Sequence, residues 1–62
     1  MKQYGCVIKD HNEYKLCSDI VLASSLNEAG KIFSKNHDVV NVFIYKDNFR
    51  YEIDQRDGSI IL

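Results

Sequence analysis

The chain has 62 residues, which is enough for one domain and leaves no room for a second. A domain this short buries only about 60% of the surface that its unfolded chain exposes, so its core is small. With 45% hydrophobic residues, 27% charged residues and a net charge of −1, the composition excludes disorder driven by self-repulsion. The near-neutral charge also excludes an affinity for nucleic acid over the whole surface, so electrostatic binding requires a local patch.

The sequence predicts a cytoplasmic protein. No apolar run approaches the roughly 18 residues that cross a bilayer. The N-terminus carries Lys2, but no apolar stretch of signal-peptide length follows it. In a cytosolic chain, Cys6 and Cys17 are expected to remain thiols rather than to form a disulfide.

An N-terminal hairpin is the first predicted feature. Residues 2–9 alternate as a strand, with Tyr4, Cys6 and Ile8 on one face. The polar residues 10–13 indicate a turn, which returns the chain through a second strand over residues 14–23. One face of that second strand is expected to carry Leu16, Ser18, Ile20 and Leu22.

A helix follows the hairpin. Ser25 and Glu28 fit a capping box, in which the two side chains satisfy free amides at a helix start. Apolar residues then recur at helical spacing and form one stripe, made of Leu26, Ala29, Ile32 and Phe33. Glycine costs about 1 kcal/mol in a helix relative to alanine, so Gly30 predicts a close approach of the helix to the sheet. The helix should end near residues 36–37.

Two or three further strands are predicted after the helix. Residues 39–45 are rich in β-branched and aromatic side chains, and residues 49–54 alternate between apolar and charged. Residues 47–48 form the turn between them. Asp57-Gly58 indicates a type I′ turn, after which residues 59–62 pair back as a short closing strand.

The predicted fold is therefore one small α+β domain over residues 1–62, with the order ββαββ. One helix packs on one face of an antiparallel sheet of four to five strands. The residues expected to face inward are Tyr4, Cys6, Ile8, Leu16, Ile20, Leu22, Val40, Val42, Ile44, Phe49, Tyr51 and Ile53, closed by Leu26, Ala29 and Phe33.

A single helix covers one sheet face and leaves the other open. The open face is expected to carry Val7, Val21, Phe43 and Tyr45, mixed with Lys15, Arg50 and Glu52. Exposed apolar groups in a cluster often mark an interface. The alternative is that a small sheet simply exposes some aromatic side chains.

Catalytic and metal-binding motifs are not recognisable in the sequence. His11 and His37 have no cysteine or histidine at metal-ligand spacing, and a zinc site made from both histidines with Cys6 and Cys17 would rest on generic spacings. The carboxylates of residues 52 and 54 share the wet face of an exposed strand. We therefore predict no enzyme, no cofactor and no metal site.

Two lysines of the predicted helix are the clearest candidates for binding. Lys31 and Lys35 stand one turn apart, opposite the apolar stripe. Like charges at that spacing disfavour a helix slightly, which makes a binding role worth considering. The alternative interpretation is two solubilising lysines on a wet face.

Residues 25–35, read as SLNEAGKIFSK, resemble the helix of small phage-encoded anti-CRISPR inhibitors of type I-F systems. Residues 1–2, 8–9 and 51–58 fall in register with the same family. The resemblance implies a CRISPR-Cas inhibitor that binds a Cascade-type surveillance complex along its crRNA-bearing backbone and blocks loading of target DNA. Lys31 and Lys35 match basic residues of the family pattern, whereas Gly30 replaces a lysine. The predicted partner-binding residues are Lys31, Lys35, Lys15, Phe43, Tyr45 and Arg50.

Other interpretations remain open. The N-terminal hairpin and residues 25–29 are similar to the antitoxin domain of HicB-type proteins, but the chain lacks their Pro-rich segment ending in Gly-Cys and their DNA-binding extension. A protein-binding module, monomeric or homodimeric through the open sheet face, is the alternative function. Direct binding of nucleic acid through Phe43, Tyr45, Arg50 and Lys15 is expected to be weak at most, and no membrane partner is expected.

Overall fold

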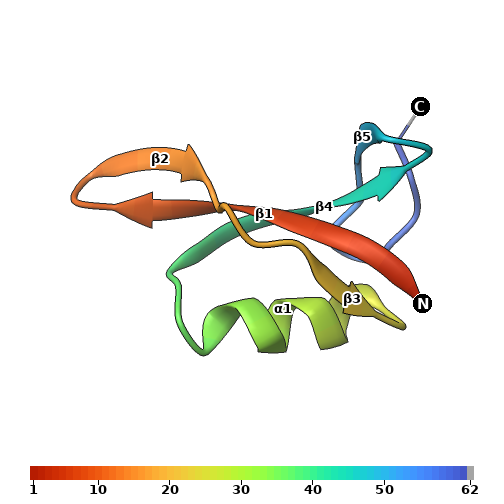
Figure 1. The fold of residues 1–62 in the computed structure, drawn as a ribbon, viewed down its shortest axis with the longest axis horizontal. Coiled ribbons are helices and arrows are strands. Elements are labelled where there is room, and N and C mark those ends of the chain that lie inside the picture. Colours follow the sequence, from red (N-terminus) through yellow and green to blue (C-terminus); the bar gives the residue numbers. More distant parts are fainter. Residues whose placement is uncertain (62) are drawn as a thin grey trace.

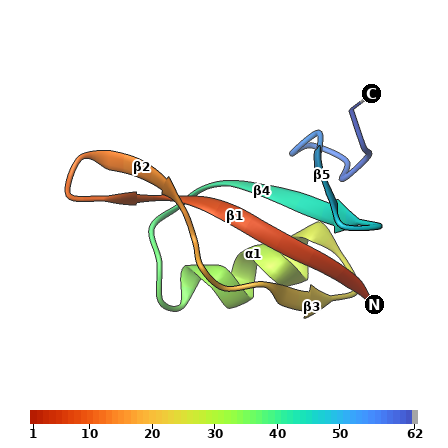
Figure 2. The ribbon, with the colours of Figure 1, turned by 45° about the horizontal axis from the view of Figure 1, so that its top comes forward.

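The computed structural model of the chain describes residues 1–61, which contain one helix and five strands (Figure 1). The elements are β1 (Lys2–Asp10), β2 (Glu13–Leu16), β3 (Val21–Ala23), α1 (Leu26–Ser34), β4 (Val39–Lys46) and β5 (Phe49–Glu52). The strands form one antiparallel sheet in the order β2-β1-β4-β5, with β3 also paired to β1. Figure 2 shows α1 on one side of this sheet. The predicted α+β class is confirmed.

The ββαββ order is not confirmed, because the expected second strand is divided in two. β2 pairs with residues 7–10 of β1, and β3 pairs with residues 2–4 of the same strand. Residues 17–20 leave the sheet between these two pairings. The register moves by two residues across this interruption, from Val7 opposite Leu16 to Tyr4 opposite Val21.

The inward face of the second strand was predicted wrongly. A tight turn at His11 and Asn12, both with positive φ, places Asp10 opposite Glu13 and therefore Val7 opposite Leu16. Residues that lie opposite each other share a sheet face, so Leu16 points away from the helix with Val7. Leu16, Ile20 and Leu22 are each more than half exposed, whereas Ala23 is buried and Cys17 and Val21 pack against the core.

The helix begins as the sequence predicts. The hydroxyl of Ser25 accepts a hydrogen bond from the backbone N–H of Glu28 at 3.2 Å. The Glu28 carboxylate accepts from the Ser24 hydroxyl at 2.5 Å, so only half of the expected capping box forms. Ala29 and Phe33 are buried against the sheet, as expected, and the helix ends at Ser34. The expectation for Gly30 is wrong, because a Cβ atom added there would meet nothing within 4 Å.

The core lies between α1 and the sheet. Its buried members are Tyr4, Cys6, Ile8, Ala23, Ala29, Phe33, Val42, Ile44 and Ile53, with Leu26 and Tyr51 among the partly buried residues packed against them. Val40 was expected inward but is half exposed, because it is the extra residue of a β-bulge between β1 and β4. Phe49 was also expected inward but is exposed, since α1 contacts β1, β3 and β4 and does not reach β5.

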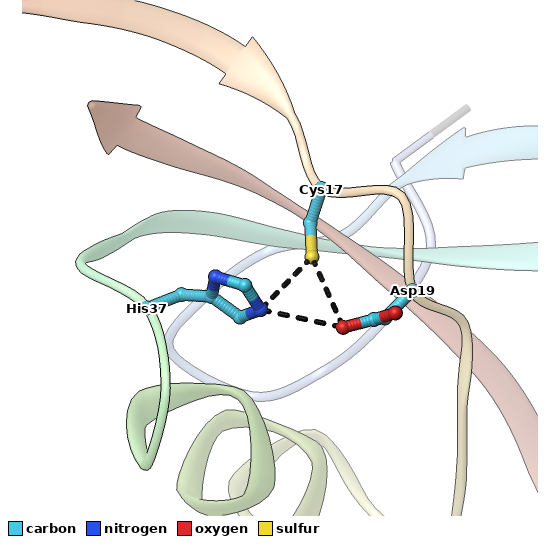
Figure 3. Close-up of side chains that lie close together, drawn as sticks. All are labelled: Cys17, Asp19 and His37. Carbon is cyan, nitrogen blue, oxygen red and sulfur yellow. Dashed lines mark hydrogen bonds and ion pairs between the residues drawn. The ribbon is translucent and has the colours of Figure 1, made fainter.

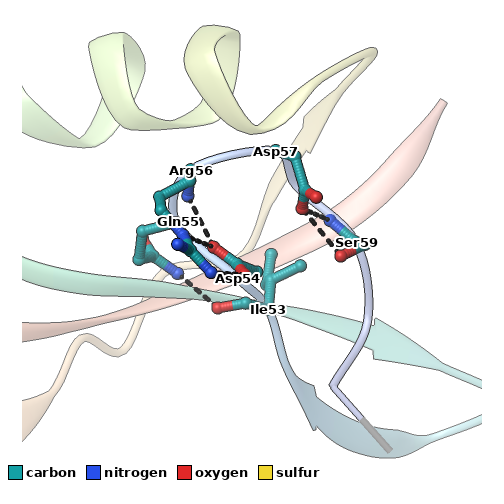
Figure 4. A network of polar contacts seen from close by, with 6 residues as sticks. All are labelled: Ile53, Asp54, Gln55, Arg56, Asp57 and Ser59. Carbon is teal, nitrogen blue, oxygen red and sulfur yellow. Dashed lines mark hydrogen bonds and ion pairs between the residues drawn. The ribbon is translucent and has the colours of Figure 1, made fainter.

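The segment after β5 crosses back beside the sheet (Figure 4). Its expected type I′ turn does not form, because Gly58 has a positive φ and Asp57 does not. A wider loop closes instead through hydrogen bonds from Asp54 N–H to Ser59 O and from Gly58 N–H to Asp54 O, each 2.8 Å long. The chain then pairs back through one bridge, Ile53 with Ile60. The expected closing strand is thus reduced to this bridge, and Leu62 lies outside the described residues.

The side chain of Gln55 continues the sheet where β5 stops. Its amide nitrogen donates to the carbonyl oxygen of Ile53 at 2.9 Å (Figure 4). The same nitrogen donates to Val42 O at 2.9 Å, and the amide oxygen accepts from Val42 N–H at 3.4 Å. Gln55→Ala removes all three hydrogen bonds, and each hydrogen bond typically contributes about 0.5–1.5 kcal/mol to the free energy of unfolding. We expect a loss of about 1–2 kcal/mol of unfolding free energy in urea, with the exposed Gln3→Ala as control. If Gln55→Ala and Gln3→Ala lost the same unfolding free energy, the proposed role of the Gln55 hydrogen bonds would be contradicted.

Candidate functional site

The outer face of the sheet, which is the face turned away from α1, is organised around Phe43. Its ring is 1% exposed although it lies outside the helix-side core. Tyr45 meets it edge to face, with ring centroids 5.2 Å apart, and the Arg50 guanidinium carbon lies 4.2 Å from the Phe43 ring centroid. Arg50 also contacts the Glu52 carboxylate at 2.8 Å. These contacts hold the two charged side chains against the sheet.

This arrangement changes the expected binding surface. Phe43 has no surface to offer a partner, so Tyr45 and Arg50 are the members of that group that a partner can contact. Val21 was expected on the same face but packs against the core. Lys15 was also expected there, yet it pairs opposite Ile8 and so belongs to the helix-side face, where its ammonium group contacts Asp10 at 2.6 Å.

Apolar side chains are exposed near the edge formed by β2 and β3. Leu16 lies opposite Val7, Leu22 opposite Gln3 and Tyr14 opposite Lys9, so all three side chains belong to the outer face. Each is more than half exposed. Within residues 1–61, no strand pairs with the free edges of β2 and β3. An exposed edge beside apolar side chains is a place where a second chain can dock.

The basic side chains of α1 lie on the opposite side of the molecule. Lys31 and Lys35 are exposed, and neither takes part in an ion pair with any of residues 1–61. The predicted binding residues therefore fall in three places. Lys31 lies on the helix with Lys35 at its C-cap, the group of Phe43 lies on the outer face, and Lys15 lies on the hairpin.

The sequence prediction missed one group of side chains. Cys17 and Asp19 from the β2–β3 connection meet His37 from the segment after α1 (Figure 3). The Cys17 sulfur lies 3.3 Å from His37 Nε2, and Asp19 Oδ2 lies 3.4 Å from the same nitrogen. A groove of about 480 Å³ runs alongside and is lined in part by Lys15, Ser18, Asn36 and Asp38.

The other cysteine and histidine are placed differently. Cys6 and Cys17 are both free thiols, and Cys6 is fully buried. Burial and the neighbouring Cys17 raise the pKa of the Cys6 thiol to about 12. His11 lies at the tip of the β1–β2 hairpin, where it contacts Asp10 and is far more exposed than His37. The four-residue zinc set considered from the sequence is therefore not assembled.

Comparison with protein-family models, with curated proteins and with solved structures gave no match. Within the described part of the chain, no helix has the length and apolar character needed to span a bilayer.

The three surfaces differ in what they can do. The helix offers two cations without carboxylate partners among residues 1–61, which suits an anionic target. The outer face offers apolar side chains and two free strand edges, which suit another protein chain. The group of Cys17, Asp19 and His37 offers sulfur, nitrogen and oxygen donors at one point.

Proposed function

We propose that this chain is a non-catalytic inhibitor that binds a type I, Cascade-type surveillance complex through α1 and blocks loading of target DNA. The observation that carries the proposal is the exposed pair Lys31 and Lys35, which has no ion-pair partner within residues 1–61. The resemblance of residues 25–35 to the helix of type I-F anti-CRISPR inhibitors supplies the target.

The packing of α1 supports this orientation. Ala29 and Phe33 fix one side of the helix to the sheet, so the lysines on the other side are held without a further ordering cost to the backbone. The two Cα atoms are separated by about 6 Å along a helix axis, at 1.5 Å per residue. Two ammonium groups at this spacing can contact neighbouring anionic groups, such as phosphates of the crRNA, on a surface built to receive nucleic acid.

Inhibition in this proposal is steric and electrostatic and needs no cofactor. A domain of 62 residues seated along the crRNA-bearing backbone excludes the target strand from the same surface. The site of action would be the cytoplasm of the bacterial host of a phage that encodes the chain. The partner is a ribonucleoprotein complex, and neither a membrane nor free nucleic acid is required.

Charge reversal on the helix tests this proposal. We expect the unmodified chain to prevent the gel shift of target DNA by a purified type I-F surveillance complex. The double variant Lys31→Glu with Lys35→Glu should no longer bind the complex, because the two introduced carboxylates are repelled by its anionic surface. The gel shift of target DNA should therefore return. Both positions are exposed, so the fold should change in stability by only about 0.5 kcal/mol per site.

The matched control is Lys2→Glu with Lys46→Glu, which makes the same charge change at two exposed lysines outside α1. The control should inhibit as well as the unmodified chain. Equal inhibition by the helix variant would remove α1 from the interface. No effect of the unmodified chain on DNA loading would contradict the proposed target.

A second candidate is a protein-binding module that forms a homodimer through the outer face, as the similarity to HicB-type antitoxins implies. The exposed side chains of Tyr14, Leu16 and Leu22 beside free strand edges favour it. Light scattering separates the two candidates, since a stable dimer that Leu16→Lys converts to a monomer would support this one.

A further inference from the structure

Three side chains from two separate connections meet on the helix side of the molecule. Cys17 and Asp19 belong to the segment between β2 and β3, and His37 belongs to the segment between α1 and β4. Cys17 is fixed by its backbone N–H, which donates to Cys6 O at 2.9 Å, and His37 by its backbone N–H, which donates to Phe33 O at 3.1 Å. Backbone hydrogen bonds therefore position Cys17 and His37 independently of the contacts between their side chains.

The contacts do not have the form of a catalytic triad. In a cysteine–histidine–carboxylate array, the carboxylate holds one ring nitrogen and the nucleophile contacts the other. Here the Cys17 sulfur and Asp19 Oδ2 both approach Nε2 of His37, at 3.3 Å and 3.4 Å. The imidazole therefore cannot pass a proton from sulfur to the carboxylate through its two nitrogens. Instead, three donor atoms face one point (Figure 3).

The spacing of these atoms matches tetrahedral zinc. With Zn–S of about 2.3 Å, Zn–N of about 2.05 Å and Zn–O of about 2.1 Å, tetrahedral angles put sulfur and nitrogen about 3.6 Å apart. The same geometry gives about 3.4 Å for nitrogen and oxygen and about 3.6 Å for sulfur and oxygen. The structure has 3.3 Å, 3.4 Å and 3.9 Å for these separations. The nitrogen–oxygen separation already fits, whereas sulfur and nitrogen must move about 0.3 Å apart and sulfur and oxygen about 0.3 Å closer. Asp19 is an exposed side chain that can move.

We propose that Cys17, Asp19 and His37 bind a Zn²⁺ ion. Thiolate and imidazole ligands together select zinc among the common divalent ions, and a carboxylate oxygen completes a set that zinc accepts. The three protein ligands leave a fourth position. The side chain of Asp19 is 66% exposed and that of His37 is 25% exposed, so water can occupy this position from the adjacent groove.

Zinc at this point would join two parts of the fold. The β2–β3 connection interrupts the sheet, and the segment carrying His37 links the helix to β4. Small domains with a limited core often use a metal ion to hold such segments together. The site is independent of the binding surface proposed on α1, because it involves neither Lys31 nor Lys35.

Metal titration of chelator-treated protein tests the site. We expect one equivalent of Co²⁺ to give a thiolate charge-transfer absorption band, Zn²⁺ to displace it, and Zn²⁺ to raise the melting temperature as a ligand of the native state does. Asp19→Asn should weaken Zn²⁺ binding at least about tenfold. Loss of a group that only hydrogen-bonds to a metal ligand already lowers metal affinity by about this factor. His37→Asn should do the same, and Cys17→Ser should abolish the band.

Matched controls are Asp47→Asn in the β4–β5 turn and His11→Asn at the hairpin tip, which change the same residue types away from the trio and its groove and should bind Zn²⁺ like the unmodified chain. Asp19 is exposed, so its variant is expected to fold and to separate loss of metal from loss of structure. A band that persists in Cys17→Ser, equal affinity of the Asp19 variant and its control, or no melting shift with excess Zn²⁺ would overturn the proposal.

Discussion

Phe33→Ala is expected to cost about 3–5 kcal/mol of unfolding free energy, the range for truncating a buried phenylalanine. The ring is 2% exposed and belongs to the core between α1 and the sheet. It is also one of two buried residues on the nine-residue helix. An isolated helix this short is marginal in water, so the packing of this face carries its stability. In a domain with few other buried side chains, we expect the variant to be largely unfolded at 25 °C.

Ile32→Ala is the matched control, because Ile32 is the neighbouring apolar residue of the helix and is 36% exposed. It should cost much less, and both changes can be measured by urea unfolding followed by circular dichroism. Comparable losses for Phe33→Ala and Ile32→Ala would mean that the helix packs on a different face.

Gly5→Ala is expected to destabilise the domain by about 1–3 kcal/mol, the usual cost of overfilling a packed site. A Cβ atom at Gly5 would lie 2.6 Å from two carbons of the Phe43 ring and 2.9 Å from Tyr45 Cε2. The Phe43 ring is held between Tyr45 and Arg50 and has little room to move. The close approach that the sequence suggested for Gly30 therefore occurs at Gly5 instead, between the central strand and an aromatic ring.

Gly30→Ala makes the same chemical change where an added Cβ has open space, so it should stabilise the helix by about 0.5–1 kcal/mol. The two variants should thus move the urea midpoint in opposite directions. A neutral or stabilising Gly5→Ala would contradict the packing of Phe43 on the outer face.

The helix and the central strand could be predicted from the sequence because their signals are local. Ser25 marks the helix start through its own hydroxyl, and Phe33 falls on the apolar stripe at helical spacing. The alternation that places Tyr4 and Cys6 in the core is likewise contained in one strand. In each case the neighbouring residues along the chain decide the result.

The remaining errors involve partners that are distant in the sequence. Leu16 was assigned inward from alternation alone, whereas pairing across the His11-Asn12 turn sets its face. The bulge that exposes Val40 depends on the register of β1 against β4. Phe49 has an inward phase but lies beyond the reach of the helix, which no local pattern reports.

The candidate sites follow the same rule. The exposure of Lys31 and Lys35 could be predicted because Lys31 lies on the regular helix and Lys35 is its C-cap residue. The meeting of Cys17 and Asp19 with His37 could not, because it needs a break in the second strand and a helix end brought beside it. The only sequence signal was the presence of two cysteines and two histidines at spacings too generic to interpret.

The most direct test of the proposed function is size-exclusion chromatography of a purified type I-F surveillance complex mixed with an excess of this chain. At low salt we expect the chain to elute with the complex, and higher salt should release it because the contact is electrostatic. Elution of all the chain at its free volume, under the same low-salt conditions, would contradict binding to this target.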